Sequence, residues 1–444
     1  MSVGLGVIMK NALKKSCRFW CITLIVALPA LANALTLKEA LTLARESLPE
    51  YQAVMLKMKA TEALATASLG PYLPRIDAQT SAIRHYIGPQ LPNYSLTNYQ
   101  LSGNWTVFDG GKRYANRQIA LLNLDNDSEE LRKTLINLEY NVKIAFYTAL
   151  ARRDSLEQKQ LQLKDAQKDY EIARGRYKYG LARLSDTLQA SVRFDQAKYN
   201  VVTADGDLRK AIDDLNSLVG NSLTARPLLD GSLEYSPFMP NIASLHQSAL
   251  QKPEIKQAED AVKIARFNRS VELSAFWPSV SADASYLRTK GVAPGSLSIP
   301  EDRTVGVSLT WNIFEFGKMF RQKSAGISTK SSEATLAEKK RTLLLDVQRV
   351  YEDFVTAADK IGVAREQLKQ AEHNYAQALG EYKIGKADIL SLVQAESLLA
   401  DARAQMINAK LDLLAAKSQL ERVAGVPALE ALPATEDSAD LAIP

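Results

Sequence analysis

Two kinds of hydrophobic periodicity alternate along the chain. Over residues 280–286 and 305–313, apolar and polar residues take turns one by one, and residues 100–107 show the same pattern earlier. Period two with one apolar face predicts β-strands, so each half of the chain is expected to hold two strands joined by a loop of turn-forming residues. Before each strand pair, over about residues 37–69 and 242–276, a single helix is expected. The apolar stripe of the last strand comprises Val305, Val307, Leu309, Trp311 and Ile313.

Apolar residues spaced alternately by four and three positions follow each strand pair. In the second half of the chain this pattern runs over residues 343–382 and resumes over residues 392–423. Such sustained spacing predicts long helices that pack as coiled coils. A helix from Lys318 to about Ile384 would be roughly 100 Å long, at about 1.5 Å per residue.

The chain consists of two copies of one unit. The sequence NWTVFDGGK at residues 104–112 returns as TWNIFEFGK at residues 310–318, and LVG at residues 218–220 returns as VAG at residues 423–425. Landmarks in one order, at a spacing of about 205 residues, indicate a duplication whose unit is too long for a solenoid repeat. The expected organisation is a signal segment at 1–34, a first repeat at 35–220, a linker at 221–241, a second repeat at 242–427 and a flexible C-terminal tail at 428–444.

The first 34 residues have the composition of a secretory signal peptide. Lys10, Lys14, Lys15 and Arg18 precede an apolar stretch over residues 19–31, and the small-x-small sequence Ala-Asn-Ala ends the segment. This order predicts export and cleavage, against the alternative of an N-terminal anchor helix. Without these residues the net charge falls from +5 to about +1, which gives no reason to expect a nucleic-acid partner.

Candidate chemistry is sparse. Both cysteines, Cys17 and Cys21, lie in the signal segment, so the mature chain would have no thiol for a disulfide, a metal or a nucleophile. His85, His246 and His373 are scattered without metal-ligand spacing. No nucleophile elbow, phosphate-binding loop or dinucleotide fingerprint occurs. The sequence therefore predicts no enzyme, no cofactor and no metal, and it has no apolar run of about 18 residues that would indicate a helical membrane protein.

Four amphipathic strands beside very long helices restrict the possible architectures. The smallest membrane barrels have about eight strands, and open strand edges are not tolerated in lipid. Several copies of the chain would therefore pool their strands, with about eight from two copies or about twelve from three. Trp105 and Trp311, near the helix-proximal ends of their strands, are candidates for an interfacial aromatic girdle. The alternative, a soluble sandwich, is disfavoured by the small number of strands.

The order of these motifs resembles that of the TolC/OprM outer-membrane factor family. The resemblance rests on the duplicated motif Trp-x-x-Phe-(Asp/Glu)-x-Gly-Lys, on a Tyr-x-x-Gly hairpin followed by Gln-Ala in each half, and on the duplicated layout, over about residues 35–427. It implies a mainly helical protein with a membrane β-barrel. Each protomer would contribute two units of two strands plus long coiled-coil helices to a homotrimer with a twelve-stranded barrel and a twelve-helix periplasmic tunnel.

The resemblance also implies a location and partners. The protein would lie in the bilayer of the outer membrane, extend into the periplasm, and work with a periplasmic adaptor and an inner-membrane transporter. Its function would be that of a passive duct, gated at its periplasmic end, in a tripartite efflux or type I secretion system. A periplasmic adaptor or a structural coiled-coil envelope protein is the alternative, which the two equivalent hairpins with their strand pairs disfavour.

The turns of the two helical hairpins are the candidate functional sites. By the resemblance, the adaptor would dock at the tips formed by Gly180 and Leu181 in the first repeat and by Gly385 and Lys386 in the second. Independently of the resemblance, the two glycines are expected to end the outgoing helices, because glycine is the usual residue at a helix C-terminus.

A periplasmic gate is implied at the same end. Asp186 and Tyr382 match a family aspartate and tyrosine, so a hydrogen bond from the Tyr382 hydroxyl to the Asp186 carboxylate is expected. The alternative is that Ser185 or Asp186 caps the returning helix.

The gate region also departs from the family pattern. Ala387 stands where some members carry an arginine, which removes one ion pair. Ser391 and Gln394 stand where some members place a ring of acids. Asp388 is then the only nearby acid of the second hairpin, and these three residues complete the candidate gate.

Overall fold

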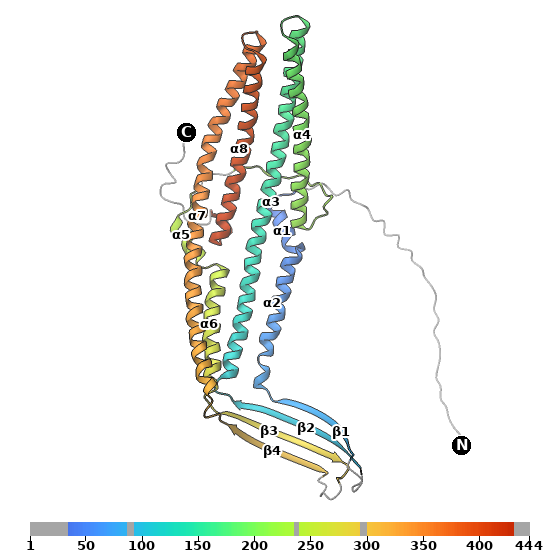
Figure 1. Cartoon of the computed structure of the whole chain (residues 1–444), viewed down its shortest axis with the longest axis vertical. Helices are drawn as coiled ribbons and strands as arrows, with labels where there is room; N and C mark the ends of the chain where they lie inside the picture. The colour runs from blue at the N-terminus through green and yellow to red at the C-terminus, as the bar shows by residue number, and fades with distance from the viewer. Residues whose placement is uncertain (1–33, 87–92, 235–238, 294–299, 430–444) are drawn as a thin grey trace, which may run out of the picture.

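The computed structural model describes residues 34–86, 93–234, 239–293 and 300–429 (Figure 1). Nearly all of the predicted signal segment and most of the predicted tail lie outside these residues. The described chain is elongated, with one curved four-stranded sheet at one end and helices that run away from it to two separate hairpin turns (Figure 1).

The two halves of the chain repeat one order of elements, as predicted. A broken helix leads into two strands, and a very long helix then pairs with a shorter returning helix. The first half contains α1 (Leu37–Ser47), α2 (Pro49–Ala67), the short 3₁₀ helix η1 (Gly70–Tyr72), β1 (Arg75–His85), β2 (Tyr94–Phe108), α3 (Lys112–Lys178) and α4 (Leu184–Val219). The second half contains α5 (Ile242–Ala249), α6 (Pro253–Ser274), β3 (Ser279–Lys290), β4 (Glu301–Thr310), α7 (Phe316–Lys383) and α8 (Ile389–Ala424).

Three element boundaries differ from the predicted ones: a break in the leading helix of each repeat and the end of the last strand. The single leading helix of each repeat is broken, because Pro49 opens α2 and Pro253 opens α6. Proline lacks an amide donor and forces the residue before it out of the helical region, so it begins a helix rather than continuing one. The last strand ends at Thr310, so Trp311 and Ile313 of the predicted stripe lie beyond β4.

The sheet has the order β1-β2-β3-β4 and is antiparallel throughout, so the pairing of β2 with β3 joins the two repeats. The register aligns Val307 with Ala282, and Ala282 with Trp105, on one face. On the other face Ser308 aligns with Ser281, and their hydroxyls lie 2.8 Å apart. The predicted alternation is therefore confirmed, and because the sheet is a single layer, Val307 is 75% exposed.

Small side chains set the packing of the long helices. Buried alanines at the predicted heptad positions, such as Ala149 in α3 and Ala402 in α8, let the helices approach closely. Within each repeat the outgoing helix packs against the returning one, and α3 also packs against α8, which brings the two hairpins together. A part-buried ion pair between Lys143 of α3 and Glu421 of α8, 2.6 Å long, reinforces this contact between the repeats.

Indole and cationic donors hold the joint between sheet and helices in both repeats. The Trp105 indole donates to the carbonyl of Tyr72 at 3.0 Å, and the Trp311 indole donates to the carbonyl of Phe276 at 3.1 Å. Lys318 donates to the carbonyl of Ala275 at 2.6 Å, and Arg113 plays a similar part in the first repeat through the carbonyls of Thr106 and Val107. The strands are thus fastened to the helices by donors that meet the carbonyls left free at element ends.

The turn from β2 into α3 provides a test of this joint. Gly110 and Gly111 both adopt positive φ, at 66° and 89°. A Cβ on Gly110 would lie 2.7 Å from the carbonyl oxygen of Ser274, whereas a Cβ on Gly111 would meet no atom within 4 Å. Gly111→Ala should therefore cost about 1–2 kcal/mol, the strain of a left-handed L-residue. Gly110→Ala should lower the melting temperature of the purified protein further, and equal melting temperatures for the two variants would contradict this close approach.

Candidate docking tips and gate

The two hairpin tips are built in the same way. Gly180 and Gly385 take positive φ just after α3 and α7, at 71° and 79°. The amide of Leu181 donates to the carbonyl of Arg176 at 2.8 Å, and the amide of Lys386 donates to that of Glu381 at 2.9 Å. These bonds satisfy carbonyls at the helix ends, so the predicted role of both glycines in ending the helices is confirmed.

The tips present apolar side chains to solvent. Leu181 is 69% exposed, and Ile384, beside Gly385, is exposed to a similar degree. Lys386 is exposed as well, and its amine makes no hydrogen bond or ion pair with any residue that the structure describes. Each tip is therefore a small apolar knob with an exposed cation beside it, Arg183 in the first repeat and Lys386 in the second.

The returning helices begin differently in the two repeats. In the second repeat Asp388 caps α8, because its carboxylate accepts a 2.9 Å hydrogen bond from the amide of Ser391. This bond holds the pKa of Asp388 below its ordinary value. In the first repeat α4 is preceded by Arg183, with no side-chain cap, so the predicted capping by Ser185 or Asp186 is wrong. Asp186 instead lies inside the first turn, where a negative charge is favoured by the helix dipole.

The expected hydrogen bond between Tyr382 and Asp186 is absent from the structure. Tyr382 is 2% exposed, and within the described part of the chain its hydroxyl has no hydrogen-bond partner. Burial raises the pKa of this hydroxyl, and the charge of Asp186 adds to the effect, so the two side chains are close without being bonded. The reason lies with the tyrosine ring, which a different side chain holds in place.

That side chain is Arg176, near the end of α3, which the sequence analysis did not identify. Its guanidinium lies 4.8 Å from the centre of the Tyr382 ring and donates to the carbonyl of Tyr382 and, at 3.4 Å, to that of Leu181. It also lies against Gly385, where a Cβ would come within 3.3 Å of it. Arg176 thus connects the tip of the first hairpin to the end of α7 in the second.

A difference between the repeats could have revealed Arg176. The sequence RYKYG at residues 176–180 corresponds to EYKIG at residues 381–385, so Arg176 occupies the position that Glu381 has in the second repeat. The remaining predicted gate residue, Gln394, is exposed on α8, and no hydrogen bond links it to the other candidates. The structure therefore brings together Asp186, Tyr382 and Arg176, and it leaves Gln394 apart.

The predicted girdle residues lie at the opposite end of the molecule from the tips (Figure 1). Trp105 and Trp311 are both exposed at the joint between the sheet and the helices, with their indole amines bonded to backbone carbonyls. Within the described residues, no helix is long and apolar enough to span a bilayer. Among the same residues, no three His, Cys, Asp or Glu side chains are grouped so that they could hold a metal ion.

Comparisons with known proteins agree on one family. The sequence profile of the family "Outer membrane efflux protein" matches residues 40–221 and 244–426. The chain is 23% identical over 423 residues to the outer membrane protein TolC of Vibrio cholerae, in an alignment that covers 90% of this chain and 93% of that protein. It is 25% identical over 304 residues to the alkaline protease secretion protein AprF of Pseudomonas aeruginosa, covering 67% of this chain and 63% of AprF.

A solved structure supports the same assignment at the level of the fold. The crystal structure of CusC, described as a transmembrane channel, superposes with a TM-score of 0.79 over 88% of this chain and 92% of that one, at 17% identity. These comparisons confirm the predicted family. They also confirm the predicted function, an outer-membrane channel of an efflux or secretion system, over the alternative function of a periplasmic adaptor. The family is one of channels rather than enzymes. Since the profile covers most of the chain, in both repeats, this protein belongs to the outer membrane efflux protein family.

Proposed function

We propose that three copies of this chain form the outer-membrane exit duct of a tripartite efflux or type I secretion system. The observation that carries the proposal is the four-stranded sheet, which is amphipathic and ends in unpaired edges at β1 and β4. Such edges are incompatible with lipid unless they pair. Pairing β4 of one copy with β1 of the next closes about twelve strands into a barrel of ordinary size for an outer membrane.

The two faces of the sheet support one orientation of this barrel. Val305, Val307 and Leu309 share the face that would contact lipid, and the serines of β3 and β4 share the face that would line the lumen. The exposed rings of Trp105 and Trp311 lie where the strands meet the helices, a position suited to the boundary between lipid and water. The long helices would then continue the barrel as a tunnel of about twelve helices across the periplasm, at about 1.5 Å per residue.

Two neighbouring positions on β4 test this orientation. Leu309 is the middle residue of the predicted apolar stripe, but β4 ends at Thr310, and Arg303 and Glu301 occupy the other end of the same face. The apolar part of β4 is therefore centred on Val307. Val307→Arg should cost about 2–4 kcal/mol if it lies near the bilayer midplane. We expect this variant to yield little heat-modifiable trimer on unheated gels and few conducting channels in planar bilayers.

Ser308→Arg is the matched control, since its side chain would project into the aqueous lumen. This variant should assemble, insert and conduct, with an altered conductance. A protein in which Ser308→Arg prevents assembly while Val307→Arg does not would have the opposite orientation. A wild-type protein that forms no conducting trimer would remove the channel proposal altogether.

The hairpin tips are proposed to receive a periplasmic adaptor, which links the duct to an inner-membrane transporter. The support is the pair of exposed apolar knobs around Leu181 and Ile384 at the end farthest from the sheet (Figure 1). AprF, to which this chain is similar, is a protease secretion protein, and TolC is an outer membrane protein. The transporter would supply the energy, so the duct itself would be passive.

A charge at the tip tests docking without disturbing the fold. Gly385 is a poor target, because a side chain there would be strained by its positive φ and would press on Arg176. Leu181→Asp should lower the yield of photo-crosslinks from a benzoylphenylalanine at position 384 to an envelope partner by about tenfold, equivalent to about 1.4 kcal/mol. Leu181→Met should keep the yield, and equal yields for the two variants would remove these tips from the docking site.

We propose further that the tips form the gate, which Arg176 keeps closed. Its guanidinium ties the end of α3 to the end of α7 across the boundary between the hairpins, next to Asp186 and Tyr382. Asp388 and Ser391 would hold the start of α8 in place through their capping hydrogen bond. Gln394 would line the narrow part of the duct next to them. A movement that separates the two hairpins would have to break the contacts of Arg176 first.

Removing the Arg176 charge tests the gate. A hydrogen bond from a charged donor contributes about 1.5–3 kcal/mol, so Arg176→Met should shift the equilibrium towards opening by about one to two decades. We expect a larger single-channel conductance or a higher open probability in planar bilayers. Arg174→Met, at an exposed arginine on the same helix, should behave as wild type. Native conductance in Arg176→Met trimers would show that this contact does not hold the gate.

A further inference from the structure

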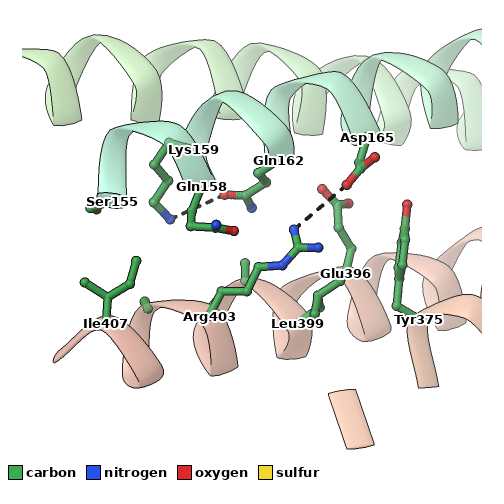
Figure 2. Close-up of a pocket in the computed structure, with 12 residues that line it drawn as sticks. Ser155, Gln158, Lys159, Gln162, Asp165, Tyr375, Glu396, Leu399, Arg403 and Ile407 are labelled. Atoms are coloured by element: carbon green, nitrogen blue, oxygen red, sulfur yellow. Dashed lines mark hydrogen bonds and ion pairs between the residues drawn. The ribbon is translucent and has the colours of Figure 1, made fainter. Parts of the chain in front are cut away.

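A narrow space between the two hairpins is lined by ionisable side chains (Figure 2). Asp165 of α3 lies opposite Arg403 and Glu396 of α8, with Tyr375 of α7 beside them (Figure 2). The space has a volume of about 20 Å³, room for about one water molecule and not for a hydrated ion or an organic ligand. The chemistry of this place is therefore that of its own side chains.

Two carboxyl groups are buried without a compensating cation, Glu396 in the lining of this space and Asp169 next to it. Asp169 is 6% exposed, and within the described residues neither of its carboxyl oxygens accepts a hydrogen bond. Glu396 is 7% exposed and has no cation within ion-pair distance in the described part of the chain. Two cations line the space, and each has another partner: Arg403 pairs with Asp165, at 4.0 Å, and the amine of Lys159 donates to the side-chain oxygen of Gln162 at 3.3 Å. We name Asp165, Asp169 and Glu396 the carboxyl cluster.

Burial decides the protonation of this cluster. An ionised carboxylate loses several kcal/mol of hydration when it is buried without a partner, so it takes up a proton instead. Burial, with a smaller effect from Asp165, raises the pKa of Asp169 to about 6. Burial, with a smaller effect from Asp169, raises the pKa of Glu396 to about 7. The Tyr375 hydroxyl acts in the opposite direction and lowers the pKa of Asp169. It does not lie close enough, in a suitable geometry, to donate a hydrogen bond to that carboxyl group.

Charged groups from every neighbouring helix act on the cluster. The cations favour ionisation, and the Tyr375 hydroxyl is itself made harder to ionise by burial and by the nearby acids, so its pKa is raised. The positive charges are too few or too distant to reverse the effect of burial. Outside the cluster itself, the groups that face it are Lys159 and Lys168 of α3, Arg193 of α4, Tyr375 and Lys383 of α7, and Arg403 of α8.

The cluster lies where the hairpins are held together. Asp169 belongs to the first hairpin and Glu396 to the second, and the packing of α3 against α8 brings them close. Asp169 is seven residues, or about two helical turns, before Arg176, so both lie on one side of α3. A change in the protonation of the cluster therefore affects the same contact between the two hairpins that Arg176 bridges at the tips.

We propose that Asp169 and Glu396 form a pH-sensitive lock between the two hairpins of one protomer. The inference rests on the proposed gate, because it supposes that the hairpins separate when the duct opens. While both carboxyls are neutral they pack as uncharged groups across the boundary. When both are ionised, two buried negative charges repel each other and draw in water, and the boundary loosens.

The direction of the pH response follows from the raised pKa values of the two carboxyl groups. Both carboxyls have a higher pKa when packed than when exposed to water. Their contribution to packing is therefore complete below the ordinary carboxyl pKa of about 4 and is lost as the pH rises through about 6 to 7. The lock is closed in acid and released towards neutral pH.

The experiment measures the distance between the hairpin tips in assembled trimers. The two cysteines of the chain precede residue 22, so Leu181→Cys with Ile384→Cys provides a clean pair for nitroxide labels in the processed protein. Pulsed electron paramagnetic resonance should give a narrow distance distribution at about pH 5, and a longer or broader one at pH 8. The change should have its midpoint between about pH 6 and pH 7.

Variants that cannot ionise assign the change to the lock. Asp169→Asn with Glu396→Gln keeps the shape of both side chains, and it should retain the pH 5 distribution at pH 8. Asp401→Asn, which removes a solvent-exposed acid from the same helix as Glu396, should respond to pH as wild type does. A pH response in the double variant equal to that of wild type would overturn the proposal, as would a wild-type distribution that is the same at both pH values.

The outcome also separates this inference from the proposed function. Conductance is recorded from the same labelled trimers in planar bilayers. Trimers that conduct but keep one tip distance at all pH values would refute the lock alone. A preparation that forms no conducting trimer would count against the channel itself, and so against the lock that depends on it.

Discussion

The structure depends on how the backbone groups at the outer edges of β1 and β4 find partners. The sheet is a single layer that pairs the two repeats through β2 and β3, and it leaves one edge open on each side. In water these edges would invite uncontrolled pairing, and in lipid each unpaired group would cost several kcal/mol. Closure by further copies, as proposed, would satisfy both edges at once, and it would require the helices that continue from the strands to close into a tube as well.

In the proposed duct, the contact between the two hairpins would have to seal a wall and also permit movement. Alanine-rich packing brings α3 and α8 close with little interlocking of large side chains. Specific polar contacts are therefore left to determine how firmly the hairpins are joined along their length. Lys143 with Glu421 fixes the boundary nearer the sheet, Arg176 fixes it at the tips, and the carboxyl cluster lies between them. This division suits a tube that is rigid at one end and adjustable at the other.

Much of the fold could be predicted from the sequence because faces and periods are local properties. Alternation from Val305 to Leu309 defines a strand whatever it pairs with, and the heptads define helices long before their partners are known. The breaks at Pro49 and Pro253 could have been predicted too, since proline acts on its own backbone. The end of β4 at Thr310 depends on pairing with Ser279, which no local pattern reveals. The Arg176 contact and the burial of Asp169 depend on how α3 meets a helix about two hundred residues away, so they emerge only in three dimensions.

The joint between sheet and helices has an optical consequence. The chain contains four tryptophans, and Trp20 lies in the predicted signal segment. The other three all lie at the joint: Trp105 and Trp311 donate to carbonyls across it, and Trp277 sits against the Gly110 turn. The processed protein would therefore carry every indole chromophore in one narrow band, far from the tips. Its tryptophan fluorescence, excited at wavelengths where the tyrosines do not absorb, would report on the joint between sheet and helices alone, without any added dye.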